Sequence, residues 1–167
     1  MVPLSISNAA AIKVGFANGE KNISNIKKYT ITSYILIIGY MLTNMVLYGV
    51  FPNQLLWIFT KDPNVVQTCL PVFAVVLCFL LFDGMQCACV GSLKGLKETK
   101  PIMWTMAFAY PFVSIPVGCI LAFGYNIVLK GFWIGLACGI FIACVISNTI
   151  LLRKLKKITK EYTKQAV

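Results

Sequence analysis

Long apolar segments separated by short polar ones dominate the chain, and four of them are long enough to cross a bilayer. They run over Tyr29–Phe51, Cys69–Leu93, Ile102–Gly124 and Gly131–Leu152. At a rise of about 1.5 Å per residue, each helix would span about 33–37 Å, which exceeds the roughly 30 Å hydrocarbon core of a membrane. The pattern therefore predicts four membrane-spanning helices.

The two ends of the chain differ from these spans. The segment Met1–Gly19 is shorter and less apolar, and it contains Lys13. We expect it to be part of a fifth helix whose start or packing partners are missing. The segment Arg153–Val167 is strongly basic, and we expect it to extend the last helix as a cytoplasmic tail that anionic lipid headgroups attract.

The loop Pro52–Gln67 between the first two spans also carries a local signal. Its Trp57 and Phe59 suit a short helix at the membrane interface, where aromatic side chains are enriched. Asp62 and Pro63 fit a turn or the start of a helix. A linker that lies on the headgroups is the simplest interpretation of this loop.

Composition supports an integral membrane protein. Hydrophobic residues make up 59% of the 167 residues and charged residues only 12%, whereas soluble domains carry about 25% charged residues. The predicted fold class is therefore all-α and integral to the membrane, a polytopic helix bundle in which residues 1–167 form a single transmembrane domain with four full spans and part of a fifth.

The net charge of +10 comes from residues at the borders of the apolar segments. Such clustering fits membrane topology better than nucleic-acid binding, which we do not expect. Twelve basic residues fall on one side of the predicted spans and two, Lys61 and Lys130, on the other. The positive-inside rule then places the C-terminus in the cytoplasm. We expect the membrane to be the plasma (inner) membrane. The twelve are Lys21, Lys27, Lys28, Lys94, Lys97, Lys100, Arg153, Lys154, Lys156, Lys157, Lys160 and Lys164.

The sequence offers little for enzyme chemistry. It has no histidine, so a Ser-His-Asp or Cys-His arrangement is impossible within this chain. Its seven cysteines all lie in apolar segments and show no C-x-x-C spacing, which argues against a zinc site or a disulfide framework. We therefore expect no catalytic residues, no cofactor and no metal other than Na⁺.

One acid stands out because it follows fourteen residues without a charge, CLPVFAVVLCFLLF. Asp83 lies ten residues before Leu93, or about 15 Å from that end of the predicted span. An ionised acid at this depth costs about 2.5–3.5 kcal/mol. Apolar surroundings disfavour its charged form, which suits Asp83 to exchanging H⁺ or Na⁺. The alternative is an acid that only ties helices together.

The neighbours of Asp83 on the same helical stripe are Phe79, Gln86 and Val90, and we call this stripe the polar face. Phe79 offers an aromatic ring to a cation, although ordinary packing or lipid contact explains it equally well. Gln86 can hydrogen-bond the acid or bind an ion through its amide oxygen. Asp83, Phe79 and Gln86 form the candidate cation or proton site.

The adjacent stripe of Gly84, Ala88, Gly91 and Gly95 is the glycine face. Small residues at this spacing let a second helix approach closely, so we assign it a packing role only. A similar ladder runs through the last span, at Gly131, Gly135 and Gly139.

Two further groups of residues lie within the spans. Pro111 and Pro116 each remove a backbone hydrogen bond and should bend the third span. The remaining polar side chains could line a water-filled cavity or join helices, and joining helices is slightly favoured. They are Tyr40, Asn44, Ser147 and Asn148.

Several of these patterns together resemble multidrug and toxic compound extrusion (MATE) transporters of the NorM-like branch. FDGMQ followed by GSLKGLK resembles the family's F-D-G-x-Q…G-x-L-R-G-x-G motif. VPLSISNAAAIKVGFANG, WIFTKDPNVV and SIPVGCILAFG…GFWIG resemble three further family motifs, and all four occur in the family's order. Lys94 stands where the family has arginine, and Lys97 replaces its last glycine.

The resemblance implies part of the second lobe of a twelve-helix transporter. It further implies efflux of organic cations or drugs by H⁺ or Na⁺ antiport, with Asp83 and the aromatic Phe79 at the cation site. The N-terminal lobe and the first helix of this lobe would then be missing partners. Three alternatives remain, namely a non-transporting membrane subunit or truncated product, a lipid-linked precursor flippase of the same superfamily, and a membrane enzyme. The missing histidine and acid clusters argue against the enzyme, and the lack of mid-span basic residues argues against the flippase.

Overall fold

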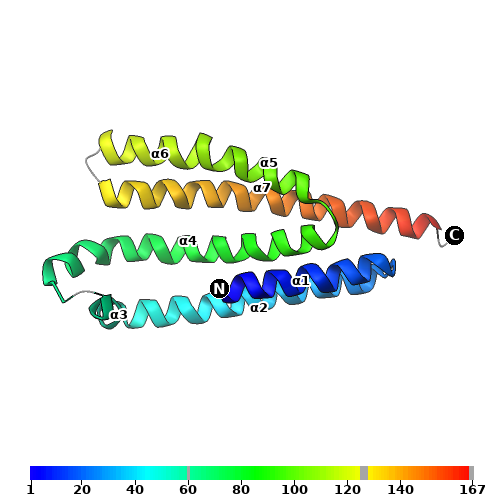
Figure 1. The fold of residues 1–167 in the computed structure, drawn as a ribbon, viewed down its shortest axis with the longest axis horizontal. Helices are drawn as coiled ribbons and strands as arrows, with labels where there is room; N and C mark the ends of the chain where they lie inside the picture. Colours follow the sequence, from blue (N-terminus) through cyan, green and yellow to red (C-terminus); the bar gives the residue numbers. More distant parts are fainter. Residues whose placement is uncertain (60, 125–127, 166–167) are drawn as a thin grey trace.

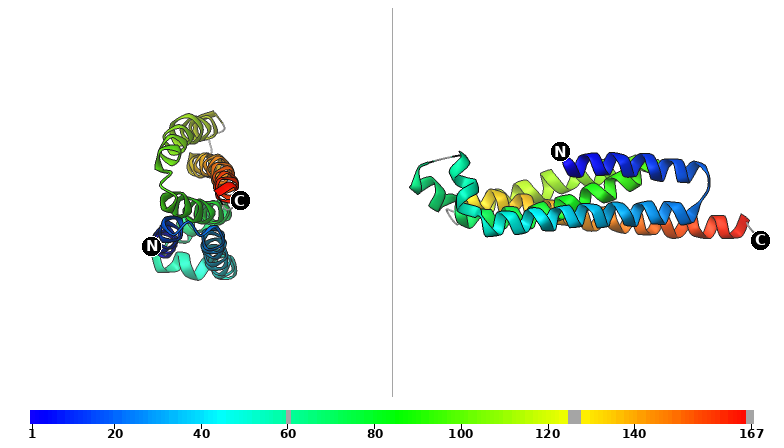
Figure 2. Two further views of the ribbon diagram at one scale, coloured as in Figure 1. Left: turned by 90° about the vertical axis from the view of Figure 1, so that its right-hand side faces the viewer. Right: turned by 90° about the horizontal axis from the view of Figure 1, so that it is seen from below.

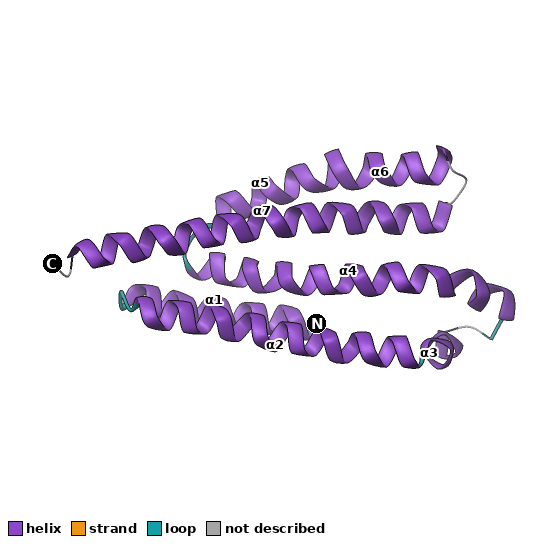
Figure 3. Cartoon of the chain, turned by 180° about the vertical axis from the view of Figure 1, so that it is seen from behind, coloured by secondary structure: helices purple, strands orange, loops and turns teal. Residues whose placement is uncertain are grey.

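A computed structural model describes residues 1–59, 61–124 and 128–165, and within these ranges all regular structure is helical (Figure 3). The elements are α1 (Val2–Gly19), α2 (Ile23–Val50), α3 (Pro52–Phe59), α4 (Pro63–Gly95), α5 (Thr99–Ala109), α6 (Ile115–Cys119) and α7 (Val128–Gln165), with π-helical turns at Tyr110–Ser114 and Ile120–Gly124. In the part of the chain that the structure describes, four helices are long and apolar enough to cross a membrane, namely Ile23–Val50, Val75–Gly95, Thr99–Gly124 and Lys130–Tyr162. The fold is therefore that of a multi-pass, all-α membrane protein.

Helix α4 lies at the centre of the bundle. Helices α1 and α2 pack on one side of it, and α7 packs on the other with α5 and α6 beyond (Figures 1 and 2). The turn between α1 and α2, the turn between α4 and α5, and the C-terminal part of α7 share one end of the bundle, which we call the basic end (Figure 1). The largest buried cluster, which includes Val14, Ile26, Cys89, Leu93 and Leu151, lies between these elements.

Several helices are longer than the apolar pattern predicts. Helix α2 begins at Ile23 rather than Tyr29, because the Asn22 side chain accepts a hydrogen bond from the Asn25 N–H at 3.1 Å and caps the helix. Helix α4 begins at Pro63 rather than Cys69, and proline is well suited to the first position of a helix. Apolar runs mark only the part of a helix that faces lipid, whereas backbone hydrogen bonding continues beyond it.

The ends of the chain also form helices. The segment Met1–Gly19 gives one helix, α1, which packs against α2 and α4. The basic segment from Arg153 continues α7 without a break as far as Gln165, while residues 166–167 lie outside the described ranges. The loop after α2 contains the expected short helix, α3, whose Trp57 is exposed. Residue 60 of this loop, and residues 125–127 between the third and fourth spans, also lie outside the described ranges.

The third span stays helical through both prolines but widens twice. One π-helical turn contains Pro111, and the other begins four residues after Pro116. Because a proline ring lacks an N–H and clashes with the preceding turn, a widened turn accommodates it without ending the helix. The α5 and α6 portions run in different directions on either side of the first widened turn (Figure 1).

The glycines of α7 match this bent helix. A Cβ atom on Gly135 would lie 2.6 Å from the Gly118 Cα, and one on Gly139 would lie 1.7 Å from the Ser114 Oγ. A side chain at position 135 would push the two backbones apart, and one at position 139 would displace the Ser114 side chain. The ladder in the last span thus lies where α7 meets the widened turns.

The glycine face of α4 lies against α1 and α2. A Cβ on Gly84 would lie 2.7 Å from the Met41 Cγ, and one on Gly91 would lie 2.4 Å from the backbone oxygen of Ser7. The Ser7 hydroxyl donates a hydrogen bond of 2.7 Å to the backbone oxygen of Cys87 at the same contact. Helices α1 and α4 therefore meet through their backbones, whereas α2 packs the Met41 side chain on Gly84.

Both helix-to-helix turns at the basic end use the same backbone motif. At the end of α4, the Glu98 N–H bonds the Leu93 oxygen at 3.0 Å and the Lys97 N–H bonds the Lys94 oxygen at 3.0 Å, which is a Schellman arrangement. Lys97 adopts a left-handed φ of 60°, and Lys21 adopts a φ of 55° at the end of α1. Glycine would suit the left-handed backbone at position 97, since it carries no Cβ penalty there.

Replacement of Lys97 by glycine should stabilise the chain. The left-handed conformation costs a residue with a side chain about 1–2 kcal/mol, and glycine avoids this cost. Glycine loses more conformational entropy on folding, which offsets part of the gain in stability. We expect a gain of about 0.5–1 kcal/mol, measured by thermal unfolding in detergent. Lys94→Gly, in the last helical turn of α4, should cost about 1 kcal/mol instead. Equal effects of the two changes would contradict this account of the turn.

Gly91→Ala should destabilise the bundle, because the added methyl group must displace the Ser7 backbone. Overpacking of this kind costs about 1–3 kcal/mol. The matched control is Gly39→Ala in α2, where nothing lies within 4 Å of the added Cβ. Thermal unfolding of both variants should show a loss for position 91 and none for position 39. A loss at both positions would refute the proposed role of the glycine face in close packing.

Candidate functional site

Asp83 lies on the central helix, in its membrane-spanning part, and is partly exposed. Within the described residues, its carboxyl group makes no hydrogen bond and no ion pair with another side chain. An acid in this position is costly unless it binds a proton, a cation or water. The carboxyl group is therefore available to a ligand.

The polar face of α4, which is adjacent to the glycine face, is turned toward α7. The Phe79 ring packs edge-to-face on Trp133 of α7, with 5.9 Å between the ring centroids. One turn beyond Asp83, the Gln86 amide donates a hydrogen bond of 3.1 Å to the Ser147 hydroxyl of α7. Asp83 thus sits between two side chains that anchor α4 to α7.

Gln86 has an unused polar atom. Its side chain is buried, and its Oε1 has no hydrogen-bond partner among the described residues. A buried amide oxygen without a donor has lost its hydrogen bonds to water without replacement, which destabilises the fold by about 1–3 kcal/mol. Such an oxygen can accept a proton from a neighbouring carboxylic acid or coordinate a small cation. Gln86 therefore combines a structural bond to α7 with a free acceptor one turn from Asp83.

The structure adds Tyr110, which sequence reasoning missed, to the surroundings of the acid. Tyr110 occupies the start of the first π-helical turn, and both Tyr110 and Cys87 lie close enough to Asp83 to interact with its charge. The proline that follows Tyr110 was a visible signal for a bend. No sequence feature indicated that Tyr110 would lie within electrostatic range of Asp83.

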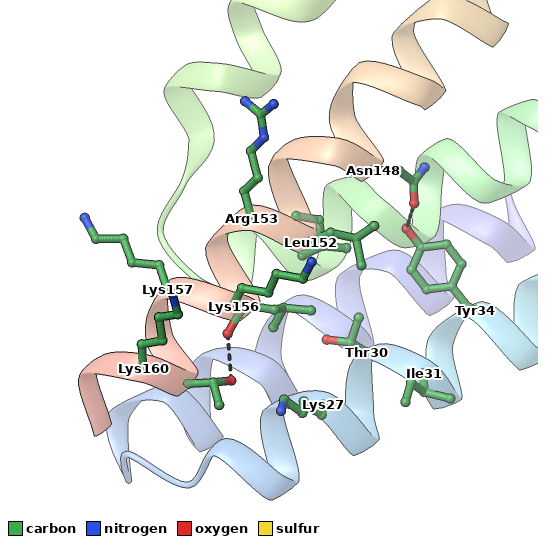
Figure 4. A pocket seen from close by; sticks show the side chains of 13 residues that line it. Lys27, Thr30, Ile31, Tyr34, Asn148, Leu152, Arg153, Lys156, Lys157 and Lys160 are labelled. Carbon is green, nitrogen blue, oxygen red and sulfur yellow. Dashed lines mark hydrogen bonds between the residues drawn. The ribbon is translucent and has the colours of Figure 1, made fainter. Parts of the chain in front are cut away.

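The other predicted polar residues lie elsewhere. Asn148 accepts a hydrogen bond of 2.5 Å from the Tyr34 hydroxyl, which joins α7 to α2, and both side chains line a groove toward the basic end (Figure 4). Asn44 donates to the backbone oxygen of Tyr40 in its own helix, at 2.8 Å. Within the described ranges, neither Tyr40 nor Asn44 makes a hydrogen bond to another helix. Their predicted place in a cavity stays a prediction.

Ser147 and Tyr34 contribute more than their sequence signal indicated. Ser147 was one of several polar residues within the spans, and it turned out to be the partner of Gln86. Tyr34 had no distinguishing signal, because its partner Asn148 lies 114 positions away. Pairings at such separations depend on how the helices rotate about their axes, which one sequence does not reveal.

Comparison with known proteins identifies relatives across nearly the whole chain. The sequence profile of the MatE family matches residues 1–120. The probable multidrug resistance protein NorM of Acinetobacter baylyi is 31% identical over 96% of this chain and 36% of its own length. The protein of the same name in Bacillus cereus (strain ATCC 14579) is 30% identical over 99% of the chain and 36% of its own length.

The fold also matches a solved structure. The crystal structure of the eukaryotic MATE transporter AtDTX14 superposes with a TM-score of 0.85 at 20% sequence identity, over 96% of this chain and 37% of that one. At this identity the match concerns the fold. The chain spans about a third of the length of the curated relatives that it matches.

The bond between Gln86 and Ser147 permits a test of what Gln86 does. Ser147→Ala should cost about 1 kcal/mol, because the buried Gln86 amide then loses its one partner. Gln86→Leu should cost less, since it removes the unpaired Oε1 together with the bond. Thermal unfolding in detergent measures both changes. A larger loss for Gln86→Leu than for Ser147→Ala would show that the amide is satisfied and mainly structural.

Proposed function

This chain belongs to the MatE family, and from that premise we propose that it forms part of the C-terminal lobe of a secondary-active transporter that expels organic cations or drugs. The names of the curated relatives, probable multidrug resistance proteins, support efflux of this kind. In this proposal H⁺ or Na⁺ moves inward as the substrate moves outward. The remaining helices of the transporter, absent from this third of the relatives' length, are the obligatory partners.

One observation carries the proposal, namely an acid within a membrane span that has no partner among the described residues. An acid that only tied helices together would be hydrogen-bonded to one of them. Asp83 is not, whereas the nearby Gln86 and Phe79 both contact α7. The carboxyl group is thus held between fixed neighbours while its own oxygen atoms stay available.

The chemistry follows from competition for one negative charge. Asp83 would bind H⁺ or Na⁺ while the site is open to the outside, and the neutralised carboxyl group would then release a cationic substrate. After the lobes rock to the inward-open state, the ion would leave and a new substrate would bind. A membrane potential of 100 mV contributes about 2.3 kcal/mol per charge to this cycle.

Each residue around Asp83 would make a different contribution to binding the ion. The Gln86 Oε1 supplies an oxygen acceptor one turn away, and Tyr110 supplies a hydroxyl group within electrostatic range. Phe79 offers its ring to a cation, and its edge-to-face contact with Trp133 fixes the orientation of that ring. The π-helical turns give the Tyr110 segment a place to bend as the site changes its access.

The clustering of basic residues at one end supports a defined orientation. The turns after α1 and α4 and the end of α7 all lie at the basic end (Figure 1). By the positive-inside rule, this end would lie on the cytoplasmic side of the plasma membrane. The ion pair between Lys154 of α7 and Glu98 of the α4–α5 turn holds these elements together there.

Asp83→Asn in a complete transporter that contains this chain should abolish ion-driven export of a fluorescent organic cation while leaving expression unchanged. Asparagine has nearly the same shape but cannot exchange a proton or balance a cation. Export is followed by the fluorescence of cells loaded with the dye, with and without an imposed H⁺ or Na⁺ gradient. The gradient that drives export identifies the coupling ion.

The matched control is Asp62→Asn, the same chemical change in the loop before α4. It should leave export at the level of the unchanged protein. Unchanged export in the Asp83→Asn variant would overturn the proposal and favour a structural acid in a non-transporting membrane subunit.

A further inference from the structure

A groove of about 990 Å³ opens between α2 and α7 toward the basic end (Figure 4), and Asp83 is not among the residues that line it. Its volume is at the upper end of the range of about 300–1,000 Å³ that is typical of small-molecule sites. The residues that line it are Lys27, Thr30, Ile31, Tyr34, Asn148, Leu151, Leu152, Arg153, Leu155, Lys156, Lys157, Thr159 and Lys160. The proposed transport mechanism gives this groove no role.

The walls of the groove are apolar. Ile31 of α2 and Leu152 of α7 are 58% and 59% exposed, and Leu151 and Leu155 line the same space. The polar side chains in it are already engaged, since the Tyr34 hydroxyl bonds Asn148 at 2.5 Å and the Thr30 hydroxyl bonds the Ile26 oxygen at 2.9 Å. The interior therefore favours a hydrocarbon occupant over a polar one.

The rim is positively charged. The groove is lined by Lys27 of α2 and by four cations of α7, namely Arg153, Lys156, Lys157 and Lys160 (Figure 4). Within the described ranges, Lys157 pairs with Glu161 at 3.9 Å, and the other four rim cations make no ion pair. Lysine and arginine bury their aliphatic stems along apolar surface and keep their charges at its edge. An anion at the rim would meet this unbalanced charge, whereas an organic cation would be repelled.

Both helices change from apolar to basic at the level of the groove. Helix α2 is basic at Lys27 and Lys28 and apolar from Tyr29 onward, while α7 is apolar to Leu152 and basic from Arg153 onward. In a membrane this boundary coincides with the level of the lipid headgroups. The groove therefore continues from the headgroup layer into the hydrocarbon core.

We propose that the groove between α2 and α7 binds an anionic diacyl phospholipid, with the phosphate among the rim cations and an acyl chain along the apolar walls. Charge complementarity carries the choice of occupant, because basic pockets between spanning helices are suited to anionic headgroups. The apolar interior excludes nucleic acid and free phosphate as sufficient occupants. The site is distinct from the cation site at Asp83 and does not depend on the proposed function.

The test uses the 167-residue chain in non-ionic detergent, with native mass spectrometry to count retained lipids. Phosphatidylglycerol and phosphatidylcholine with identical acyl chains are offered at equal concentrations. We expect one phosphatidylglycerol to be retained in preference to phosphatidylcholine. Equal retention of the two lipids would overturn the proposal.

A pair of charge variants separates the groove from general attraction to anionic lipid. Lys27→Gln combined with Lys156→Gln removes two rim charges, and Lys28→Gln combined with Lys100→Gln removes two exposed charges outside the groove. A basic residue near a membrane contributes about 1 kcal/mol, so the rim variant should bind phosphatidylglycerol about 25-fold more weakly. The control should bind nearly as well as the unchanged chain, and equal losses would overturn the proposal.

A second pair tests the acyl-chain wall. Leu152→Trp should fill the groove and displace the lipid, whereas Leu36→Trp, at a position that is 54% exposed and outside the groove, should not. Glycerol 3-phosphate should fail to compete, because it lacks acyl chains, and effective competition would identify a headgroup-only anion site instead. A shift between monomer and dimer in the rim variant, without a change in lipid retention, would assign the groove to a second copy of the chain.

Discussion

The close approach of α1 and α2 to the glycine face of α4 is the constraint on which the rest of the structure depends. A methyl group at Gly91 or Gly95 would lie within 3 Å of the α1 backbone, so α1 can meet α4 only where α4 has no side chains. The contact fixes the rotation of α4 about its own axis. Because the polar face lies on the adjacent stripe of the same helix, its direction toward α7 is fixed as well. Packing against the glycine face of α4 thus positions the candidate chemistry on the adjacent stripe.

The sequence predicted the broad features of this arrangement for identifiable physical reasons. Hydrocarbon thickness demands long apolar runs, which are visible in any single sequence, and the predicted all-α class with four apolar spans agrees with the structure. Local rules also worked for the short helix after Phe51 and for the helix start at Pro63, because proline and aromatic residues act on their immediate surroundings. Helix limits were less accurate, since the cap at Asn22 lies outside the apolar run that defined the span.

Features that depend on the rotation of one helix against another were not predictable. The partners Gln86 and Ser147 are 61 positions apart, and Tyr34 and Asn148 are 114 positions apart. Each of these residues looked like an isolated polar group in an apolar helix. The left-handed backbone at Lys97 was equally hidden, because a lysine there gives no local sign of a turn that favours glycine. The prolines indicated a bend in the third span, but neither its π-helical form nor the electrostatic interaction of Tyr110 with Asp83 followed from them.

Helix α7 contacts both the surroundings of Asp83 and the groove at the basic end. Its consecutive residues Ser147 and Asn148 carry separate bonds, one to Gln86 of α4 and the other to Tyr34 of α2. Gln86 lies one turn from the acid, while Tyr34 lies in the groove toward the basic end. Because the two residues share one helical turn, a rotation or slide of α7 that breaks the bond to α4 also displaces the residue that holds α2. The surroundings of Asp83 and the width of the groove are therefore set by the same two residues of one helix.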